Sequence, residues 1–124
     1  MDGHTHRMLL VDDDIETRTV MRRMLALCLR GWEIEEAGTL AEGLARLRPP
    51  PDCLLLDLDL PDGAGEALLR RVRDEDLPTH VVVSTGNGDA TRLGEVSCLA
   101  PDAFVPKPLD ATGLTTICGL ATSG

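Results

Sequence analysis

Carboxylates follow two short apolar runs of this chain, where their type and spacing allow chemistry. Asp12 and Asp13 come directly after MLLV (8–11), and Asp57 comes directly after CLLL (53–56). If these runs are neighbouring parallel strands, they lie ~4.8 Å apart and their acids meet at one sheet edge. Like charges about 4 Å apart repel by about 4 kcal/mol at an effective dielectric of about 20. A divalent cation relieves that repulsion, and an all-oxygen site with room for water suits Mg²⁺.

A lysine and a hydroxyl group complete the candidate site. Lys107 is the single lysine beside eleven arginines and lies in FVPKP, just after another apolar run. A lysine there is a compact positive charge for an anion. Thr85, in Ser84-Thr85-Gly86, follows HVVV and can donate a hydrogen bond to an anionic oxygen. A cation and a lysine beside a carboxylate favour phosphoryl transfer onto it, with Asp57 as the in-line nucleophile.

Each cluster also has a plain structural explanation. Asp14 is typical of a helix N-cap, and the acids from Asp57 to Asp62 are typical of a turn. Lys107 alone is compatible with an ordinary surface position, and residues 84–86 with the start of a loop. The coincidence of both acidic clusters at strand ends is what favours a metal site, from which we leave Asp14 out as a cap.

Composition indicates one domain with an aliphatic core. The chain has 124 residues, 43% of them apolar, and its net charge of −9 argues against a nucleic-acid surface. No apolar run approaches the ~20 residues of a membrane span, and no signal peptide is evident at the start. We expect a soluble cytoplasmic protein with no membrane or nucleic-acid partner.

The four cysteines lie far apart in apolar neighbourhoods, without a C-x-x-C motif. We predict that they are small core residues rather than disulfide partners or metal ligands. They are Cys28, Cys53, Cys98 and Cys118. Two histidines, His4 and His6, lie in residues 1–7, which we expect to be a disordered tail.

Apolar spacing predicts five strands that alternate with five helices. The predicted strands are 8–11, 32–37, 53–56, 80–84 and 102–105. The predicted helices are 15–28, 40–47, 66–73, 89–99 and 110–121, the last of them weak because of its glycines and threonines. Such alternation indicates an α/β fold: a doubly wound five-stranded parallel sheet with helices on both faces.

Four motifs in this order resemble the receiver domain of two-component response regulators. They are LLVDD (9–13), LLLDLDLPDGAG (54–65), VVVSTG (81–86) and DAFVPKP (102–108). The resemblance covers residues 8–121 and implies a flavodoxin-like sheet with strand order 2-1-3-4-5.

The resemblance also implies a role for each acid. Asp57 is the implied phosphoacceptor, and Asp12 and Asp13 are the implied Mg²⁺-binding acids. The backbone carbonyl of Asp59 is a further implied metal ligand, with its side chain facing solvent.

Lys107 is expected to pair with the phosphoryl oxygens and to precede a cis proline, Pro108. Thr85 is expected to follow the phosphoryl group, and Phe104 to move inward as an aromatic switch, although Phe104 is also compatible with a plain core residue. The surface formed by the fourth helix, fifth strand and fifth helix then changes shape.

Expected partners follow from this family. A sensor histidine kinase or histidine phosphotransfer protein would donate the phosphoryl group and dock near residues 15–28, where Arg18, Arg22 and Arg23 are candidate contacts. Output would act on a downstream protein target or through an output domain absent from this chain. Ala100-Pro101 departs from the glycine-alanine pair usual at this position, and Phe104 lacks the hydroxyl of the commoner tyrosine.

Two alternative functions remain open. A haloacid-dehalogenase-like phosphatase also places D-x-D after an apolar strand, as in Asp57-Leu58-Asp59, but its paired acids follow the nucleophile, whereas Asp12 and Asp13 precede it. A pseudo-receiver would use the same fold only for binding, without phosphorylation. A calcium loop is rejected, because Leu68 stands where the bidentate glutamate is required.

Overall fold

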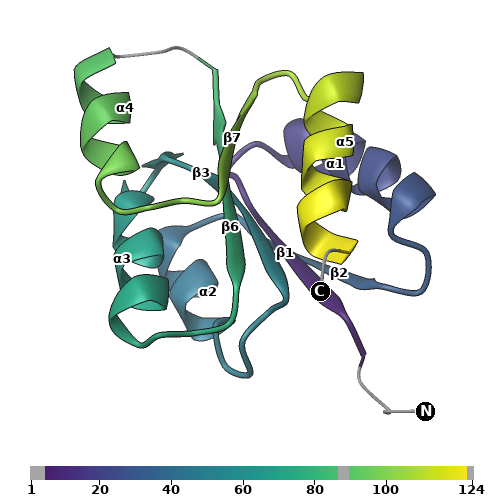
Figure 1. Cartoon of the computed structure of the whole chain (residues 1–124), viewed down its shortest axis with the longest axis horizontal. Coiled ribbons are helices and arrows are strands. Elements are labelled where there is room, and N and C mark those ends of the chain that lie inside the picture. Colours follow the sequence, from purple (N-terminus) through teal and green to yellow (C-terminus); the bar gives the residue numbers. More distant parts are fainter. Residues whose placement is uncertain (1–4, 87–89, 123–124) are drawn as a thin grey trace.

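The computed structural model describes residues 5–86 and 90–122 (Figure 1). A parallel five-stranded sheet forms its centre, in the order β2-β1-β3-β6-β7. Its strands are β1 (Arg7–Val11), β2 (Glu33–Ala37), β3 (Cys53–Asp57), β6 (His80–Thr85) and β7 (Ala103–Pro106). Counted along this sheet alone, the order is 2-1-3-4-5, so the predicted topology is confirmed. The sequence did not predict the two-residue strands β4 (Asp59–Leu60) and β5 (Gly63–Ala64), which pair with each other after β3.

Helices cover both faces of the sheet, as predicted. They are α1 (Ile15–Cys28), α2 (Leu40–Ala45), α3 (Glu66–Asp74), α4 (Ala90–Ser97) and α5 (Ala111–Thr122). Figure 1 shows α1 and α5 on one face and α2, α3 and α4 on the other. Asp89, the first residue of the predicted fourth helix, lies outside the described residues.

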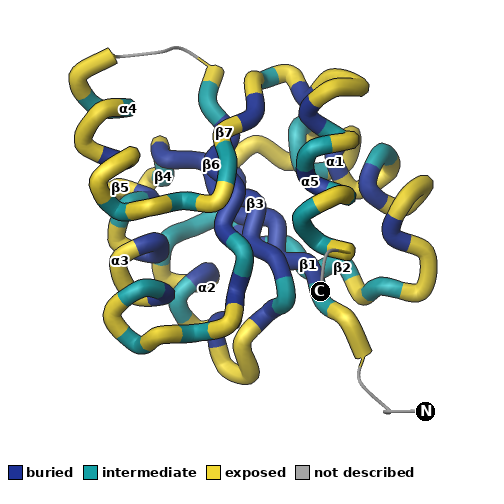
Figure 2. The backbone as a smooth tube through the Cα atoms, in the orientation of Figure 1, coloured by how far each residue is buried: buried dark blue, intermediate teal, exposed yellow. Residues whose placement is uncertain are grey.

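The sheet separates two aliphatic cores, because alternate strand residues point to opposite faces. Leu54 and Leu56 of β3 pack under α2, α3 and α4, whereas Cys53 and Leu55 pack under α1 and α5. All four are at most 2% exposed, and Figure 2 shows the strands as the buried centre of the molecule. A central parallel strand is buried on both faces, which explains the unbroken apolar run in the sequence.

Side-chain caps begin the first two helices. Asp14 accepts hydrogen bonds from the Thr17 amide and hydroxyl, at 3.3 and 2.5 Å. Thr39 likewise accepts from the Glu42 amide, at 3.0 Å. These bonds satisfy amide groups that have no partner within a helix's first turn.

Two residues of the predicted N-terminal tail pack against the domain. Arg7 is the first residue of β1, and its guanidinium forms two hydrogen bonds with Glu35 on β2, at 3.0 and 3.1 Å. His6 stacks on Trp32 with 4.9 Å between the ring centroids. The predicted tail is therefore wrong for these residues, because β1 pairs with β2 from Arg7 onward. His4 and the other residues before position 5 lie outside the described residues.

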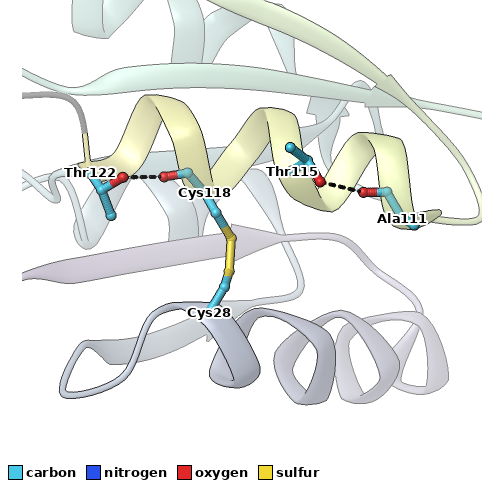
Figure 3. Close-up of a disulfide and its surroundings, with 5 residues drawn as sticks. All are labelled: Cys28, Ala111, Thr115, Cys118 and Thr122. Atoms are coloured by element: carbon cyan, nitrogen blue, oxygen red, sulfur yellow. Dashed lines mark hydrogen bonds between the residues drawn. A yellow bond between two sulfur atoms is a disulfide. The ribbon is translucent and has the colours of Figure 1, made fainter.

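The prediction that all four cysteines are core residues is wrong for three of them. Cys53 is fully buried, but Cys98 is exposed. Cys28 and Cys118 form a disulfide between α1 and α5, with Cα atoms 6.4 Å apart (Figure 3). The apolar neighbourhoods of Cys28 and Cys118 in the sequence gave no sign of this pairing, because it depends on α1 and α5 packing side by side on one sheet face.

The last helix forms over 12 residues despite its two glycines and four threonines. Ile117 is fully buried on the α1 side of the sheet, with Leu114 packed beside it. The Thr115 hydroxyl donates a hydrogen bond to the Ala111 carbonyl at 2.9 Å (Figure 3). Tertiary packing thus overrides a weak helix propensity. Among the described residues, none of the helices has the length and apolarity needed to cross a membrane.

Candidate functional site

Three carboxylates meet beyond the carboxyl ends of β1 and β3. Oxygen atoms of Asp12, Asp13 and Asp57 all lie within 4.8 Å of one another. The pairing of Val11 with Leu56 puts the ends of the two parallel strands at the same level, so the next residues of both strands share one edge. Asp12 is 2% exposed and Asp57 8% exposed, whereas Asp13 reaches solvent.

The loop after β1 is held by several hydrogen bonds. Asp12 Oδ1 accepts from the Asp14 amide at 2.9 Å, and the Asp12 amide donates to the Ala37 carbonyl at 3.1 Å. Arg18 on α1 donates to the Asp12 carbonyl at 2.5 Å and to Glu36 Oε1 at 3.0 Å. The acidic loop is therefore fixed by both the sheet and the first helix.

Lys107 spans the two buried acids of the cluster. Its Nζ lies 2.5 Å from Asp12 Oδ2 and 3.1 Å from Asp57 Oδ2. Its backbone amide donates to the Thr85 carbonyl at 2.9 Å, and this bond ties the loop after β7 to the end of β6. The peptide bond between Lys107 and Pro108 is cis, as the resemblance implied.

Burial and charge act on the site in opposite directions. Burial raises the pKa of Asp57 above its ordinary value, although hydrogen bonds from the Asp59 amide and Lys107 act against this. Burial disfavours the charged form of Lys107, but hydrogen bonds to Asp12 and Asp57 outweigh it and raise the pKa of Lys107. The lysine therefore stays charged and partly compensates the acids.

The donor set fits Mg²⁺. Three carboxylates face one ammonium group, so negative charge remains in excess at the site. The atoms are hard oxygens without sulfur or nitrogen ligands, which is the set that Mg²⁺ prefers, and the exposed Asp13 leaves room for metal-bound water.

A cavity of about 180 Å³ opens beside Asp57. Its walls include Asp57, Asp59, Ser84, Thr85, Gly86 and Arg92. Ser84 Oγ is fully buried there and has no hydrogen-bond partner among the described residues. Thr85 is half-buried at the rim. The structure thus places the predicted hydroxyl group in the same cavity as the predicted nucleophile.

Gly65 allows the loop after β3 to close tightly. A Cβ atom on Gly65 would collide with the Asp57 carbonyl oxygen and lie 2.9 Å from the Leu58 Cα. The Gly65 amide donates to the Leu58 carbonyl at 2.8 Å. This glycine therefore helps to fix the backbone that carries Asp57 and Asp59.

Two acids near the site, Asp59 and Asp62, use their side chains for structural contacts. Asp62 accepts hydrogen bonds from the Leu40 and Ala41 amides, at 2.7 and 2.9 Å, and so caps α2 although it is distant from that helix in the sequence. The side chain of Asp59 is 83% exposed, as expected, and its carboxylate pairs with Arg92. No role for Arg92 could be predicted from the sequence, because its contacts depend on the placement of α4.

Other expected residues lie away from the carboxylate cluster. Phe104 is 38% exposed on β7, so the alternative of a plain core residue is wrong in this conformation. Arg18 was predicted as a candidate contact of the kinase, but its side chain is only 15% exposed and pairs with Glu36. Arg22 also pairs with Glu36, and Arg23 is exposed.

Comparison with known proteins agrees with this geometry. Residues 8–118 match the family described as the response regulator receiver domain. Among solved structures, the receiver domain protein of Methanospirillum hungatei JF-1 superposes with a TM-score of 0.79 at 28% identity, covering 90% of this chain and 88% of that one. A putative response regulator from Chloroflexus aurantiacus J-10-fl gives 0.83 at 24% identity, covering 97% and 100%, which shows the shared fold.

Curated relatives are longer than this chain. The acid tolerance regulatory protein ActR of Rhizobium meliloti (strain 1021) is 36% identical over 111 residues, which are 88% of this chain and 56% of that protein. The transcriptional regulatory protein TrcR of Mycobacterium tuberculosis is 39% identical over 108 residues, 86% of this chain and 41% of that protein. The chain thus spans about half the length of these relatives. By sequence match and fold, it belongs to the response regulator receiver domain family.

Proposed function

We propose that Asp57 accepts a phosphoryl group from a phosphohistidine of a sensor histidine kinase or histidine phosphotransfer protein, in the cytoplasm and with Mg²⁺. The observation that carries this proposal is the position of Asp57 at the sheet edge, with Lys107 Nζ 3.1 Å away and the carboxylates of Asp12 and Asp13 beside it. Asp12, Asp13, Asp57 and the backbone carbonyl of Asp59 would hold the metal.

Phosphoryl transfer needs one nucleophile and compensation of charge. An Asp57 carboxylate oxygen attacks the phosphorus in line, the P–N bond breaks, and the imidazole leaves with the bonding electrons and takes up a proton. Lys107 and the Thr85 hydroxyl donate hydrogen bonds to the phosphoryl oxygens. Mg²⁺, when bound, supplies positive charge that offsets the charge on these oxygens.

The proposed switch starts from an outward Phe104. A dianion on Asp57 attracts the hydroxyl of Thr85, at the end of β6. The movement of Thr85 leaves space on the sheet face that Thr85 shares with Phe104, and Phe104 turns into this space. Phe104 and Val83 are opposite each other in the register of these strands. The surface of α4, β7 and α5 would then present a different shape to a downstream protein target or an output domain.

Acetyl phosphate and intact-mass measurement test the phosphoacceptor. With Mg²⁺, the wild-type protein should gain the mass of one phosphoryl group, and Asp57→Asn should gain none. Asp14→Asn is the matched control, since it removes a neighbouring charge but keeps a capping side chain, and it should be phosphorylated. A folded wild-type protein that gains no mass would support the pseudo-receiver instead.

Two further measurements separate the remaining alternatives. Steady turnover of a generic phosphate ester, lost on Asp59→Asn, would favour the phosphatase. Transfer from a phosphorylated histidine phosphotransfer protein to wild type, but not to Asp57→Asn, is expected for a receiver domain.

A further inference from the structure

The disulfide between Cys28 and Cys118 joins two helices at a solvent-accessible point. Cys28 is exposed at the last residue of α1, and Cys118 is half-buried in the second half of α5 (Figure 3). Their Cα separation of 6.4 Å lies within the range that disulfides span. The two sulfurs therefore meet without any need to move either helix.

A groove beside the two sulfurs gives access to them. It has a volume of about 390 Å³, and its walls are Cys28, Leu114, Thr115, Cys118, Gly119 and Thr122. A Cβ atom built on Gly119 would meet nothing within 4 Å. A small thiol or disulfide thus has space to approach, which exchange requires because the attacking thiolate must reach a sulfur atom.

The other two cysteines do not share these properties. Burial raises the pKa of the Cys53 thiol to about 12, so its reactive thiolate is scarce. Cys98 is exposed but free, and its Sγ lies 3.5 Å from the Gly94 carbonyl oxygen. Only Cys28 and Cys118 combine access with a second thiol in bonding reach.

We propose that Cys28 and Cys118 are a reversible redox pair that links α1 to α5 when the surrounding ratio of disulfide to thiol rises. Disulfides in a reducing cytoplasm are usually transient or redox-sensing, and exposed ones exchange most readily. A low-molecular-weight disulfide such as glutathione disulfide is the oxidant.

The exchange balances in two steps. The Cys28 thiolate attacks the small disulfide, whose S–S bond breaks and releases one thiolate. The Cys118 thiolate then attacks Cys28 Sγ in the mixed disulfide and displaces the second thiolate. The protein loses two electrons and two protons, and the small disulfide becomes two thiols.

The link has a consequence for the switch, which rests on the proposed function. α1 begins two residues after Asp13, and α5 begins shortly after Lys107. The disulfide fastens the second half of α5 to the last residue of α1, so it restrains one element of the proposed switch surface. Oxidation should leave the site intact but reduce the movement of α5.

A redox titration of Cys98→Ser protein tests the pair without any phosphorylation. The folded protein is equilibrated at graded ratios of glutathione disulfide to glutathione, alkylated and weighed. We expect oxidation to remove two hydrogen atoms, to lower the alkylated thiols under denaturing conditions from three to one, and to reverse in excess glutathione. Peptide mapping should find a link between Cys28 and Cys118, and Cys28→Ser should instead hold one glutathione on Cys118.

Three results would overturn the pair: thiols that stay free in excess glutathione disulfide, separate adducts on both cysteines, or a link reducible only after denaturation. Amide exchange of α5 then tests the consequence, since it should be several-fold slower in the oxidised form with acetyl phosphate present. Equal exchange in protein shown by mass to be phosphorylated would refute the restraint. A protein that oxidises reversibly but takes up no phosphoryl group would refute the proposed function alone.

Discussion

Arg92 on α4 and Asp59 after β3 form an ion pair, with 2.5 Å between Nη1 and Oδ1. The same guanidinium donates to both carboxylate oxygens of Glu66, each at 2.9 Å, and to the Leu58 carbonyl at 2.9 Å. One side chain thus fastens α4 to the loop that follows Asp57 and to the start of α3. Since α4 belongs to the proposed switch surface, this contact joins that surface to the site.

Arg92→Met should loosen α4 while keeping most of the side chain's length. Asp59 is largely exposed, so its pair contributes little, whereas Glu66 is 17% exposed and is bound in a bidentate manner. We expect the free energy of unfolding to fall by about 1 kcal/mol after allowance for solvent screening, and α4 amides to exchange faster. Urea unfolding and amide exchange measure this. Arg70→Met, on an exposed position of α3, should change neither.

The Glu66 contact predicts a specific pH dependence. The hydrogen bond from Arg92 lowers the pKa of Glu66 below its ordinary value of 4.5. Because the folded protein binds this proton less tightly than the unfolded chain does, the contact stabilises the protein above pH 4.5 and is lost as pH falls through the lowered pKa. Wild type should therefore exceed Glu66→Gln in stability at pH 7, with the difference shrinking in acid. A difference that does not change with pH would show that the charge on Glu66 is unimportant.

Mg²⁺ should stabilise the protein against heat. A ligand that binds only the folded state at about 100 times its dissociation constant adds about 2.7 kcal/mol. The unfolding temperature of the wild-type protein should therefore rise when Mg²⁺ is added, and Asp12→Asn should lose most of this increase. Asp14→Asn, whose carboxylate caps α1, should keep it. Equal shifts in NaCl of matched ionic strength would attribute the effect to screening rather than to a site.

The sheet and the grouping of the site residues could be predicted from the sequence, because a parallel sheet allows few arrangements of its strands and of the residues that follow them. Unbroken apolar runs such as residues 53–56 require burial on both faces, and residues that follow such strands must lie at one edge. The grouping of Asp12, Asp57 and Lys107 could therefore be predicted from strand order without any knowledge of side-chain contacts.

What escapes prediction depends on how helices turn and where they sit. Cys28 and Cys118 are 90 residues apart, and only the side-by-side packing of α1 and α5 brings them together. Arg92 reaches Asp59 and Glu66 through the placement of α4, which no local pattern encodes. Asp62 caps α2 across a separation of 22 residues from Leu40, unlike the local caps of Asp14 and Thr39.

Ala100 is held in a backbone conformation that favours glycine. Its φ is 56°, in the left-handed region, at the position where the family usually has glycine. The Cβ atom destabilises the folded state by about 1–2 kcal/mol in this conformation. Replacement by glycine removes that cost, but part of the gain is lost because glycine gives the unfolded chain more conformational freedom. Ala100→Gly should raise the free energy of unfolding by about 0.5–1 kcal/mol. Ala67→Gly, inside α3, should lower it by a similar amount, and a loss in both variants would rule out strain at Ala100.

The two glycines of α5 should respond to alanine in opposite directions. A Cβ atom on Gly119 meets nothing within 4 Å, so Gly119→Ala should gain the usual helix preference of about 0.5–1 kcal/mol. A Cβ atom on buried Gly113 would lie 2.9 Å from Leu109 Cδ1 and 3.2 Å from Asp110 Oδ1, so Gly113→Ala must push Leu109 aside. We expect a net loss of about 1 kcal/mol or more there, because overpacking outweighs propensity. Urea unfolding of both variants under oxidising conditions, with the link to α1 intact, tests this contrast, and equal gains would mean that α5 packs less tightly against the sheet than described.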